Sequence, residues 1–459
     1  MRIRNRRTTV IAVAALCAVA LVVTMVVRSR SMSHRADAAL DDLRSMPGVS
    51  SARAQNYPES DGGARDAIVT VSESATTKQV ADVLAGARKA AAGESISDIS
   101  VRVGAAHATI SDRTKRPAQA APALAALAAL PHGSAEVKGY GYGDGYEATI
   151  DPDGQQPVAV ARTALQLVHR TGAPDGNLYV GTQTNAVVTV DESIAGASRL
   201  LTVLRPYEKE LRRVRVSRTA VSVTADAGVS TIDLHRALAP VVRDESPTRT
   251  LTVDGAPGET QIDGSGPTTS VTETAAHLRS RHLGLTGFST DERSIKVAGA
   301  TKKLTAKDLP NVQRALATLR PRLPRNSDIT VERTPGGLEP LFSGSPADLS
   351  RMAPRAGAAA AKGYDVSWNG DFEVTVVMPP GAKLTTTTVK PAMAVARGLG
   401  WKGSLWVQIG EYGENADTET ARFQSTATGS TKAVFGDVED TEGLKRVWNA
   451  TATDAGAAS

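Results

Sequence analysis

The same helical signature occurs five times along this chain, and it constrains the fold more than any other feature. In each copy apolar residues stand at positions i, i+3, i+4 and i+7, on one face of an amphipathic helix. The sets begin at Val80, Ala161, Leu234, Val312 and Val389. Their spacings are 81, 73, 78 and 77 residues, so we predict about five tandem copies of a unit of roughly 75 to 80 residues.

The second copy shows the order of elements most clearly. The sequence predicts a helix at Pro122–Leu130, strands at Glu136–Tyr142 and Tyr146–Ile150, a helix from Pro157, and strands at Asn177–Gly181 and Ala186–Val190. Asp144 and Gly145 separate the first two strands, and Asp-Gly between extended runs is typical of a tight hairpin. The order of elements is therefore αββαββ.

The second and fifth copies also resemble each other residue by residue. Lys138-Gly139-Tyr140 returns as Lys362-Gly363-Tyr364, and Tyr146-Glu147-Ala148-Thr149 returns as Phe372-Glu373-Val374-Thr375. These offsets of 224 to 226 residues are close to three units. Asn369-Gly370 takes the place of Asp144-Gly145 at the hairpin turn.

The predicted fold class is α+β. An αββαββ unit of this size fits a circularly permuted ferredoxin-like module, in which two helices pack on one face of an antiparallel sheet. A continuous solenoid sheet is the competing arrangement. The predicted boundaries are 1–7 for a cytoplasmic basic N-terminus, 8–27 for a transmembrane helix, 36–111, 118–190, 193–263, 271–342 and 346–426 for the five repeats, and 427–459 for a tail with a short helix and a disordered end.

The N-terminal segment predicts a membrane anchor. Thr8–Val27 is an uncharged apolar run of 20 residues, and as a helix it spans about 30 Å, the thickness of a bilayer's hydrocarbon core. A cleavable signal peptide is the alternative, with Ala36-Asp37-Ala38 as a loose cleavage motif, but apolar regions of signal peptides are shorter. The single cysteine, Cys17, lies inside the span.

Charge argues against a nucleic-acid partner. The chain has a formal charge of +5, but residues 1–30 hold six arginines and no acid, which leaves 53 − 6 = 47 basic residues against 48 acidic ones. A nearly neutral remainder lacks the positive surface that phosphate binding requires. The basic N-terminus favours a cytoplasmic N-terminus and an extracytoplasmic C-terminal region, although Arg28, Arg30 and Arg35 weaken that bias. The exported region has no cysteine and must rely on packed cores.

Composition gives one broad resemblance. Arginine outnumbers lysine, and Ala, Val, Gly and Thr dominate. Together with the short N-terminal anchor, this composition resembles that of single-pass envelope proteins of unassigned role in high-GC actinobacteria. The resemblance implies a cell-envelope location, and it carries over no site residue because no motif is shared.

Motifs for familiar chemistry are missing from the sequence. The seven histidines have no paired ligand spacing, and no HExxH, GxSxG, SxxK or Walker A pattern occurs. Asp151-Pro152-Asp153-Gly154 lacks the remaining ligands of a calcium loop, so it predicts a turn. We therefore predict no catalytic residue, no metal and no cofactor.

Aromatic residues give the one hint of a binding surface. All four tryptophans, Trp368, Trp401, Trp406 and Trp448, fall near the C-terminus, and tryptophan and tyrosine are favoured as interface anchors. A richer core in the last repeat is the simpler explanation of the same placement. The candidate interaction surface comprises Tyr140, Tyr142, Tyr146, Tyr364, Trp368, Trp406 and Trp448.

Three functions fit these features. The leading hypothesis is a non-enzymatic, membrane-anchored extracytoplasmic scaffold or binding protein, whose partner is another envelope or secreted protein or a cell-wall polymer. The second is an envelope enzyme with a site between modules, using Asp144, Glu147, Asp371 and Glu373, and paired carboxyl groups with raised pKa values would favour it. The third is peptide or cell-wall ligand binding at exposed sheet edges.

Overall fold

The computed structural model describes most of the chain after residue 33. The described residues are 34–55, 65–93, 96–139, 145–173, 176–181, 187–191, 196–256, 259–291, 293–320, 322–337, 340–370, 372–379, 382–401, 403–410, 420–436 and 440–456. The chain divides into two compact units, Met1–Val221 and Ser222–Ser459. The predicted transmembrane helix, residues 8–27, lies outside the described residues.

Unit 1 alternates helices with strand pairs. Residues 34–44 are helical. The further helices are α2 (Thr77–Ala91), η1 (Pro117–Ala120), α3 (Ala121–Leu127), α4 (Pro157–Arg170), α5 (Ala197–Leu204) and η2 (Arg205–Glu210). The strands are β1 (Val49–Gln55), β2 (Arg65–Val71), β3 (Ile96–Val103), β4 (Ala106–Ser111), β5 (Ser134–Gly139), β6 (Tyr146–Asp151), β7 (Gly176–Val180), β8 (Val188–Val190) and β9 (Leu211–Val216). The chain passes between the units within β10 (Ala220–Ala225).

Unit 2 repeats the same alternation. Its helices are α6 (Thr231–Glu245), α7 (Thr269–Arg279), η3 (Ala306–Asp308), α8 (Leu309–Ala317), α9 (Pro346–Ala360), α10 (Thr386–Leu399) and α11 (Thr441–Gly456). Its strands are β11 (Thr250–Asp254), β12 (Gln261–Asp263), β13 (Leu283–Ser289), β14 (Ser294–Gly299), β15 (Asp328–Glu332), β16 (Pro340–Gly344), β17 (Asp365–Asn369), β18 (Glu373–Val377), β19 (Leu405–Gly410) and β20 (Thr420–Ser425).

Strands pair in sequence order within each unit and form a long mixed sheet. In unit 1 the pairs β1–β2, β3–β4, β5–β6 and β7–β8 are antiparallel hairpins, whereas β2–β3, β4–β5, β6–β7 and β8–β9 are parallel. Unit 2 continues this alternation from the antiparallel pair β11–β12 to the antiparallel pair β19–β20. Each parallel step contains a helical crossover, as parallel neighbours require.

The smallest repeating element is thus one helix followed by one hairpin. Successive α-helices from α2 to α10 begin 34 to 44 residues apart, which confirms a mixed α/β tandem repeat and halves its period. The prediction of antiparallel sheets in ferredoxin-like modules is wrong, because consecutive hairpins join by parallel pairing. Strand patterning fixes which residues face the core but leaves open which strand pairs with which. The solenoid alternative describes the pairing inside each unit.

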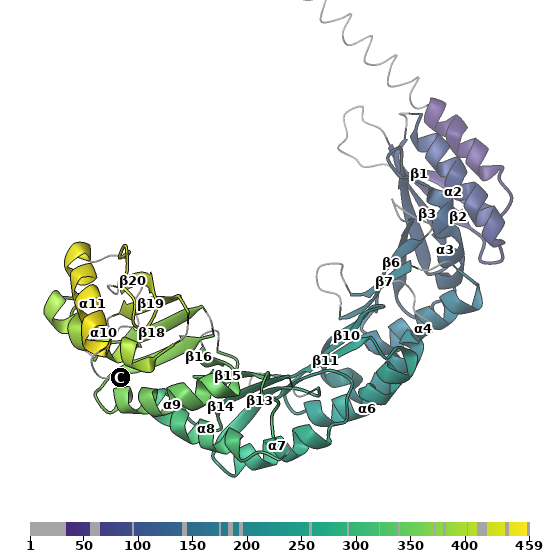
Figure 1. Ribbon diagram of the computed structural model, residues 1–459. Helices are drawn as coiled ribbons and strands as arrows, with labels where there is room; N and C mark the ends of the chain where they lie inside the picture. Colours follow the sequence, from purple (N-terminus) through teal and green to yellow (C-terminus); the bar gives the residue numbers. More distant parts are fainter. Residues whose placement is uncertain are drawn as a thin grey trace, which may run out of the picture. The chain divides into compact units, whose positions relative to one another are not determined.

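Helices cover one face of the sheet in each unit (Figure 1). Strand residues alternate accordingly. In β18, Val374 and Val376 are fully buried against helices, while Glu373 and Thr375 are partly exposed on the opposite side. We call that opposite side, which carries none of the described helices, the open face.

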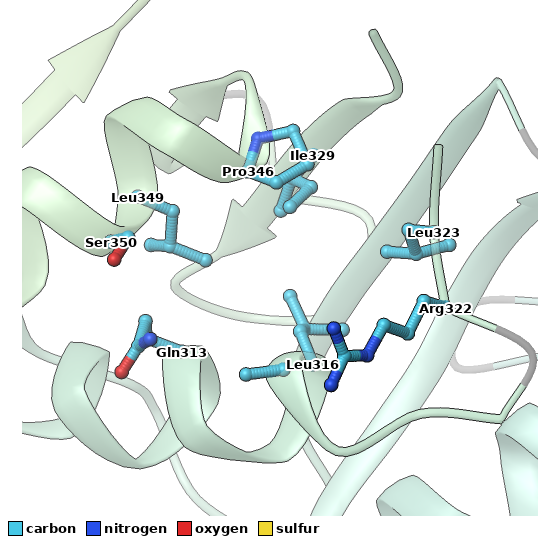
Figure 2. Close-up of a pocket in the computed structure, with 9 residues that line it drawn as sticks. Gln313, Leu316, Arg322, Leu323, Ile329, Pro346, Leu349 and Ser350 are labelled. Atoms are coloured by element: carbon cyan, nitrogen blue, oxygen red, sulfur yellow. The ribbon is translucent and has the colours of Figure 1, made fainter. Parts of the chain in front are cut away.

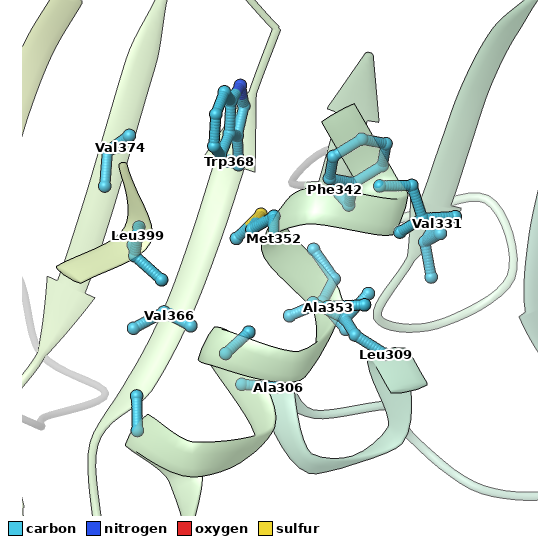
Figure 3. Close-up of a cluster of buried hydrophobic side chains, with 14 of the residues drawn as sticks. Ala306, Leu309, Val331, Phe342, Met352, Ala353, Val366, Trp368, Val374 and Leu399 are labelled. Carbon is cyan, nitrogen blue, oxygen red and sulfur yellow. The ribbon is translucent and has the colours of Figure 1, made fainter. Parts of the chain in front are cut away.

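The core of unit 2 lies between the sheet and its helices. Figure 3 shows Val366 and Trp368 of β17 directed at Met352 of α9, with Phe342 of β16 beside them. The rings of Phe342 and Trp368 are 6.4 Å apart between centroids. Aliphatic and aromatic side chains of this kind supply most of the burial energy of a domain.

Local signals in the sequence match the observed element ends. Thr76 caps α2, and Gln79 completes a capping box with it. Pro157 is the first residue of α4, where its missing N–H costs little. The turn after Asn369 differs from the expected two-residue hairpin, because Asn369 still pairs with Glu373 and the loop has three residues. Gly370 takes the left-handed conformation there, with φ of 54°.

No helix within the described ranges is long and apolar enough to cross a bilayer.

Candidate functional site

The strongest candidate site is a cluster of aromatic side chains on unit 2. Phe372 and Phe435 are both 56% exposed, and they are the exposed large hydrophobic residues among the described parts of the chain. Trp406 of β19 packs edge-on against Phe435, with ring centroids 6.2 Å apart. The guanidinium of Arg422 on β20 lies 4.8 Å from the centre of the Trp406 ring. We call these four residues the aromatic patch.

The backbone holds these side chains in place. The N–H of Trp406 donates to the carbonyl of Phe372 at 2.9 Å, so the residue before β18 lies beside the start of β19. Arg422 and Phe435 exchange two backbone hydrogen bonds of 2.7 Å. These bonds hold Phe435 against the outer edge of β20. Main-chain hydrogen bonds therefore place Phe372 beside the start of β19 and Phe435 beside β20.

Trp406 and Arg422 of the patch belong to two rows of side chains that cross four strands on the open face. The register pairs Asn369 with Glu373, Glu373 with Trp406, and Trp406 with Gln424. The parallel row, two residues along each strand, is Ser367, Thr375, Gln408 and Arg422. All eight side chains are partly or fully exposed. With neighbouring strands about 4.8 Å apart, each row spans about 14 Å.

The two rows carry no net charge. Nε of Arg422 lies 3.4 Å from Oε1 of Glu373, and they form an ion pair; the other six residues of the rows are uncharged. The same guanidinium makes the cation–π contact with Trp406, which at a partly exposed site is worth about 0.5–1 kcal/mol. The surface therefore offers aromatic area and hydrogen-bonding groups without a strong field.

Three of the seven predicted surface residues are buried instead of exposed. Tyr146 and Trp448 have no exposed area, and Trp368 is 3% exposed, so none of the three can contact a partner in this fold. Tyr364 is partly buried against the core of unit 2. Tyr140 and Tyr142 lie outside the described residues. Trp406 alone of the predicted set lies in the aromatic patch, and its role in binding stays a prediction.

The buried tryptophans account for the aromatic-rich C-terminus. Trp401 and Trp448 stack with ring centroids 6.4 Å apart, and Phe423 lies 4.2 Å from Trp448. The indole N–H of Trp448 donates to Ser425 at 3.1 Å. This cluster docks α11 onto the last hairpin. The concentration of tryptophans near the C-terminus therefore reflects a richer core in the last repeat.

Sequence reasoning missed Phe372, Arg422 and Phe435 as site residues. Phe372 was visible only as the counterpart of Tyr146, yet its place next to an Asn-Gly turn was a usable signal, because hairpin loops are exposed. Arg422 alternates with Ala421 and Phe423, which are buried, and this alternation places it on the open face. Nothing in the sequence indicated that Phe435 returns to the edge of β20.

Of the four carboxyl groups considered for an enzyme, only Glu147 and Glu373 lie within the described residues. Asp144 and Asp371 lie outside the described residues, and Glu373 is tied to Arg422; Glu147 belongs to unit 1 and Glu373 to unit 2. Two other carboxyl groups have lowered pKa values, whereas a general acid needs a raised one. A hydrogen bond from Ser289 lowers the pKa of Asp291. Partial burial of Asp308 is outweighed by hydrogen bonds from Lys302 and Thr305, which lower its pKa.

The histidines likewise make separate contacts. His235 is buried, and its Nε2 lies 2.7 Å from the carbonyl of Gly264. Nε2 of His277 lies 3.0 Å from the carbonyl of Ala315. In the part of the chain that the structure describes, no three His, Cys, Asp or Glu side chains come together in a way that would hold a metal ion.

No protein-family model, no curated protein and no solved structure matches the chain.

Proposed function

We propose that this chain is a non-enzymatic, membrane-anchored scaffold or binding protein of the bacterial cell envelope. Residues 8–27 would cross the membrane once with the N-terminus in the cytoplasm, and the repeats would lie outside the cytoplasm. Alkaline carbonate extraction of the full-length chain tests the anchor. Recovery in the soluble fraction would contradict single-pass anchoring.

The aromatic patch is the proposed contact with a protein partner, another envelope or secreted protein. The observation that carries this proposal is that exposed Phe435 packs on Trp406, beside Arg422, on a face free of described helices, with exposed Phe372 next to the start of the same strand. Aromatic residues and arginine are enriched at protein interfaces, whereas lysine and aspartate are depleted. A neutral face with one paired arginine suits a protein surface better than a polyanion.

A site-specific photo-crosslinker tests this contact in native envelopes. We would place it in the full-length chain at Gln424, which is exposed and registers with Trp406, and at Thr109 as the matched control. Thr109 is also an exposed strand residue, on β4 in unit 1. The expected result is one protein cross-linked from Gln424 and not from Thr109.

Purified partner and full-length chain then give the affinity. Trp406→Ala is expected to weaken binding about 30-fold or more, the loss typical of an interface hot spot of at least ~2 kcal/mol. Phe372→Ala and Phe435→Ala should weaken it less. Trp368→Ala is unsuitable, because that side chain belongs to the core. Unchanged affinity in Trp406→Ala, or cross-linking only to cell-wall polymer, would overturn a protein contact at this patch.

A further inference from the structure

A groove on the helical side of unit 2 has the features of a small-molecule site. It opens between the end of α8 and the start of α9 and has a cavity volume of about 340 Å³, within the range of about 300–1,000 Å³ found for ligand pockets. We call it the α8–α9 groove. It is separate from the aromatic patch, which lies on the open face.

The floor of the groove is apolar. Leu316 of α8, Ile329 of β15 and Leu349 of α9 are buried residues that line it, and Leu323 of the connecting loop lies beside them. Figure 2 shows these side chains directed into the same space. An apolar part of a ligand placed here would leave water and contact apolar side chains. Such burial is favourable by about 25 cal/mol per Å² of apolar area.

The rim of the groove is polar and positively charged. Figure 2 shows Arg322 on one side of the opening, with Gln313 and Ser350 on the other side. Arg322 is exposed, and guanidinium, amide and hydroxyl groups all donate hydrogen bonds. The rim therefore presents donors around an apolar floor.

The surrounding charge reinforces this polarity. Residues 309–327 contain four arginines, all exposed, and no acid. They are Arg314, Arg320, Arg322 and Arg325. The nearest acids in sequence on the packed elements are Asp308 just before α8, Asp328 at the start of β15 and Asp348 on α9. Asp308 is paired with Lys302 at 2.7 Å. Asp348 already accepts hydrogen bonds from Ser345 and Arg351, at 2.6 Å each.

We propose that the α8–α9 groove binds a single-chain anionic amphiphile. Its apolar chain would lie on Leu316, Leu323 and Leu349, and its carboxylate or phosphate head group would contact Arg322. Arginine suits both head groups, because its fork of N–H donors matches their oxygens. A neutral amphiphile would leave the positive rim without a counter-charge.

Photolabelling of the full-length chain in membrane vesicles tests the site. The probes are a diazirine derivative of decanoic acid, the corresponding decyl phosphate, and the corresponding decanol as the neutral control. We expect the anionic probes to label peptides that hold Leu316, Leu323 or Leu349, and unlabelled decanoate to compete. The stronger of the two anionic probes identifies the head group. Equal labelling by the decanol probe would overturn the proposal.

Three variants separate the groove from its surroundings. Arg322→Ala should reduce labelling about ten-fold, since one charge-assisted hydrogen bond is worth roughly that factor. Arg325→Ala removes another exposed arginine, one that does not line the groove, and it should label like the parent chain. Ser350→Trp fills the opening from the surface and should abolish labelling. Labelling that survives Ser350→Trp, or that falls equally in Arg325→Ala, would contradict a site in this groove.

Discussion

Replacing Arg397 with methionine is expected to release the C-terminal helix α11 from unit 2. Arg397 is buried in α10 and has no carboxylate partner in the hydrogen bonds that surround it. Its Nη2 donates to the carbonyls of Trp448 and Gly429 at 2.7 and 2.9 Å, and its Nη1 donates to that of Ala427 at 2.7 Å. Nε donates to Thr451 at 2.9 Å.

The guanidinium also stacks on the last tryptophan. Its central carbon lies 3.8 Å from the centre of the Trp448 ring. Burial lowers the pKa of Arg397 to about 10, so the side chain stays charged at neutral pH. Carbonyl dipoles and an aromatic face therefore stabilise a buried cation that links α10, the segment after β20, and α11.

The expected loss of stability depends on whether each carbonyl that accepts a hydrogen bond from Arg397 keeps another donor. The carbonyl of Trp448 also accepts from Thr451, and that of Gly429 also accepts from Ser425. Among these carbonyls Ala427 loses its charged donor without such a replacement. Hydrogen bonds to a charged group are worth about 1.5–3 kcal/mol each, but the cation no longer has to be desolvated. We expect a net loss of about 3 kcal/mol.

Hydrogen exchange of the full-length chain measures this loss locally. Repeat proteins open in parts, so peptides from Thr441–Gly456 should exchange about a hundredfold faster, while the strands of unit 1 keep their protection. Arg397→Lys keeps the charge without the fork of donors and should lie between the two. Unchanged exchange in α11, or an equal change throughout the chain, would refute the linking role of Arg397.

Two further predictions concern single positions in each unit. Burial lowers the pKa of His235, so the unfolded chain takes up a proton first as pH falls below about 6.5. The unfolding free energy should then drop by up to ~1.4 kcal/mol per pH unit until the pH reaches the folded pKa. Denaturant titrations of His235→Leu should lack this slope. At Gly133, with φ of 85°, an added Cβ would lie 2.1 Å from the carbonyl oxygen of Asp151, so Gly133→Ala should cost over ~2 kcal/mol in unfolding free energy. Gly154 has φ of 73° and open space, and Gly154→Ala should cost only about 1 kcal/mol; equal losses would contradict the clash.

Local patterns in the sequence predicted the elements but not their neighbours. The capping residues Thr76 and Gln79 and the apolar spacing of the five helices placed those helices correctly, because these signals act within a few residues. Strand pairing depends on contacts far apart in sequence. An αββαββ chain has the same local pattern whether its hairpins interleave or follow one another, so the sequential order remained one of two alternatives.

The candidate site was only partly visible for a related reason. Trp368 stands between Ser367 and Asn369, and this alternation was enough to assign it to the face of Val366, which is buried. Trp406 shares its face with Gln408, so its exposure was equally readable. The return of Phe435 to the edge of β20 depends on tertiary pairing and had no local signal.

One helix for each hairpin separates stability from binding on this sheet. Crossovers of one hand place the described crossover helices on the same face, and each strand then gives half of its side chains to the core and half to the open face. Substitution of Trp448 removes a ring with no exposed area, whereas substitution of Trp406 removes one that is partly exposed beside Phe435. The first change should lower stability by about 3–5 kcal/mol and the second by much less. Residues on the open face of such a repeat can therefore be substituted at a smaller cost in stability than core residues, which leaves them available to specify a partner.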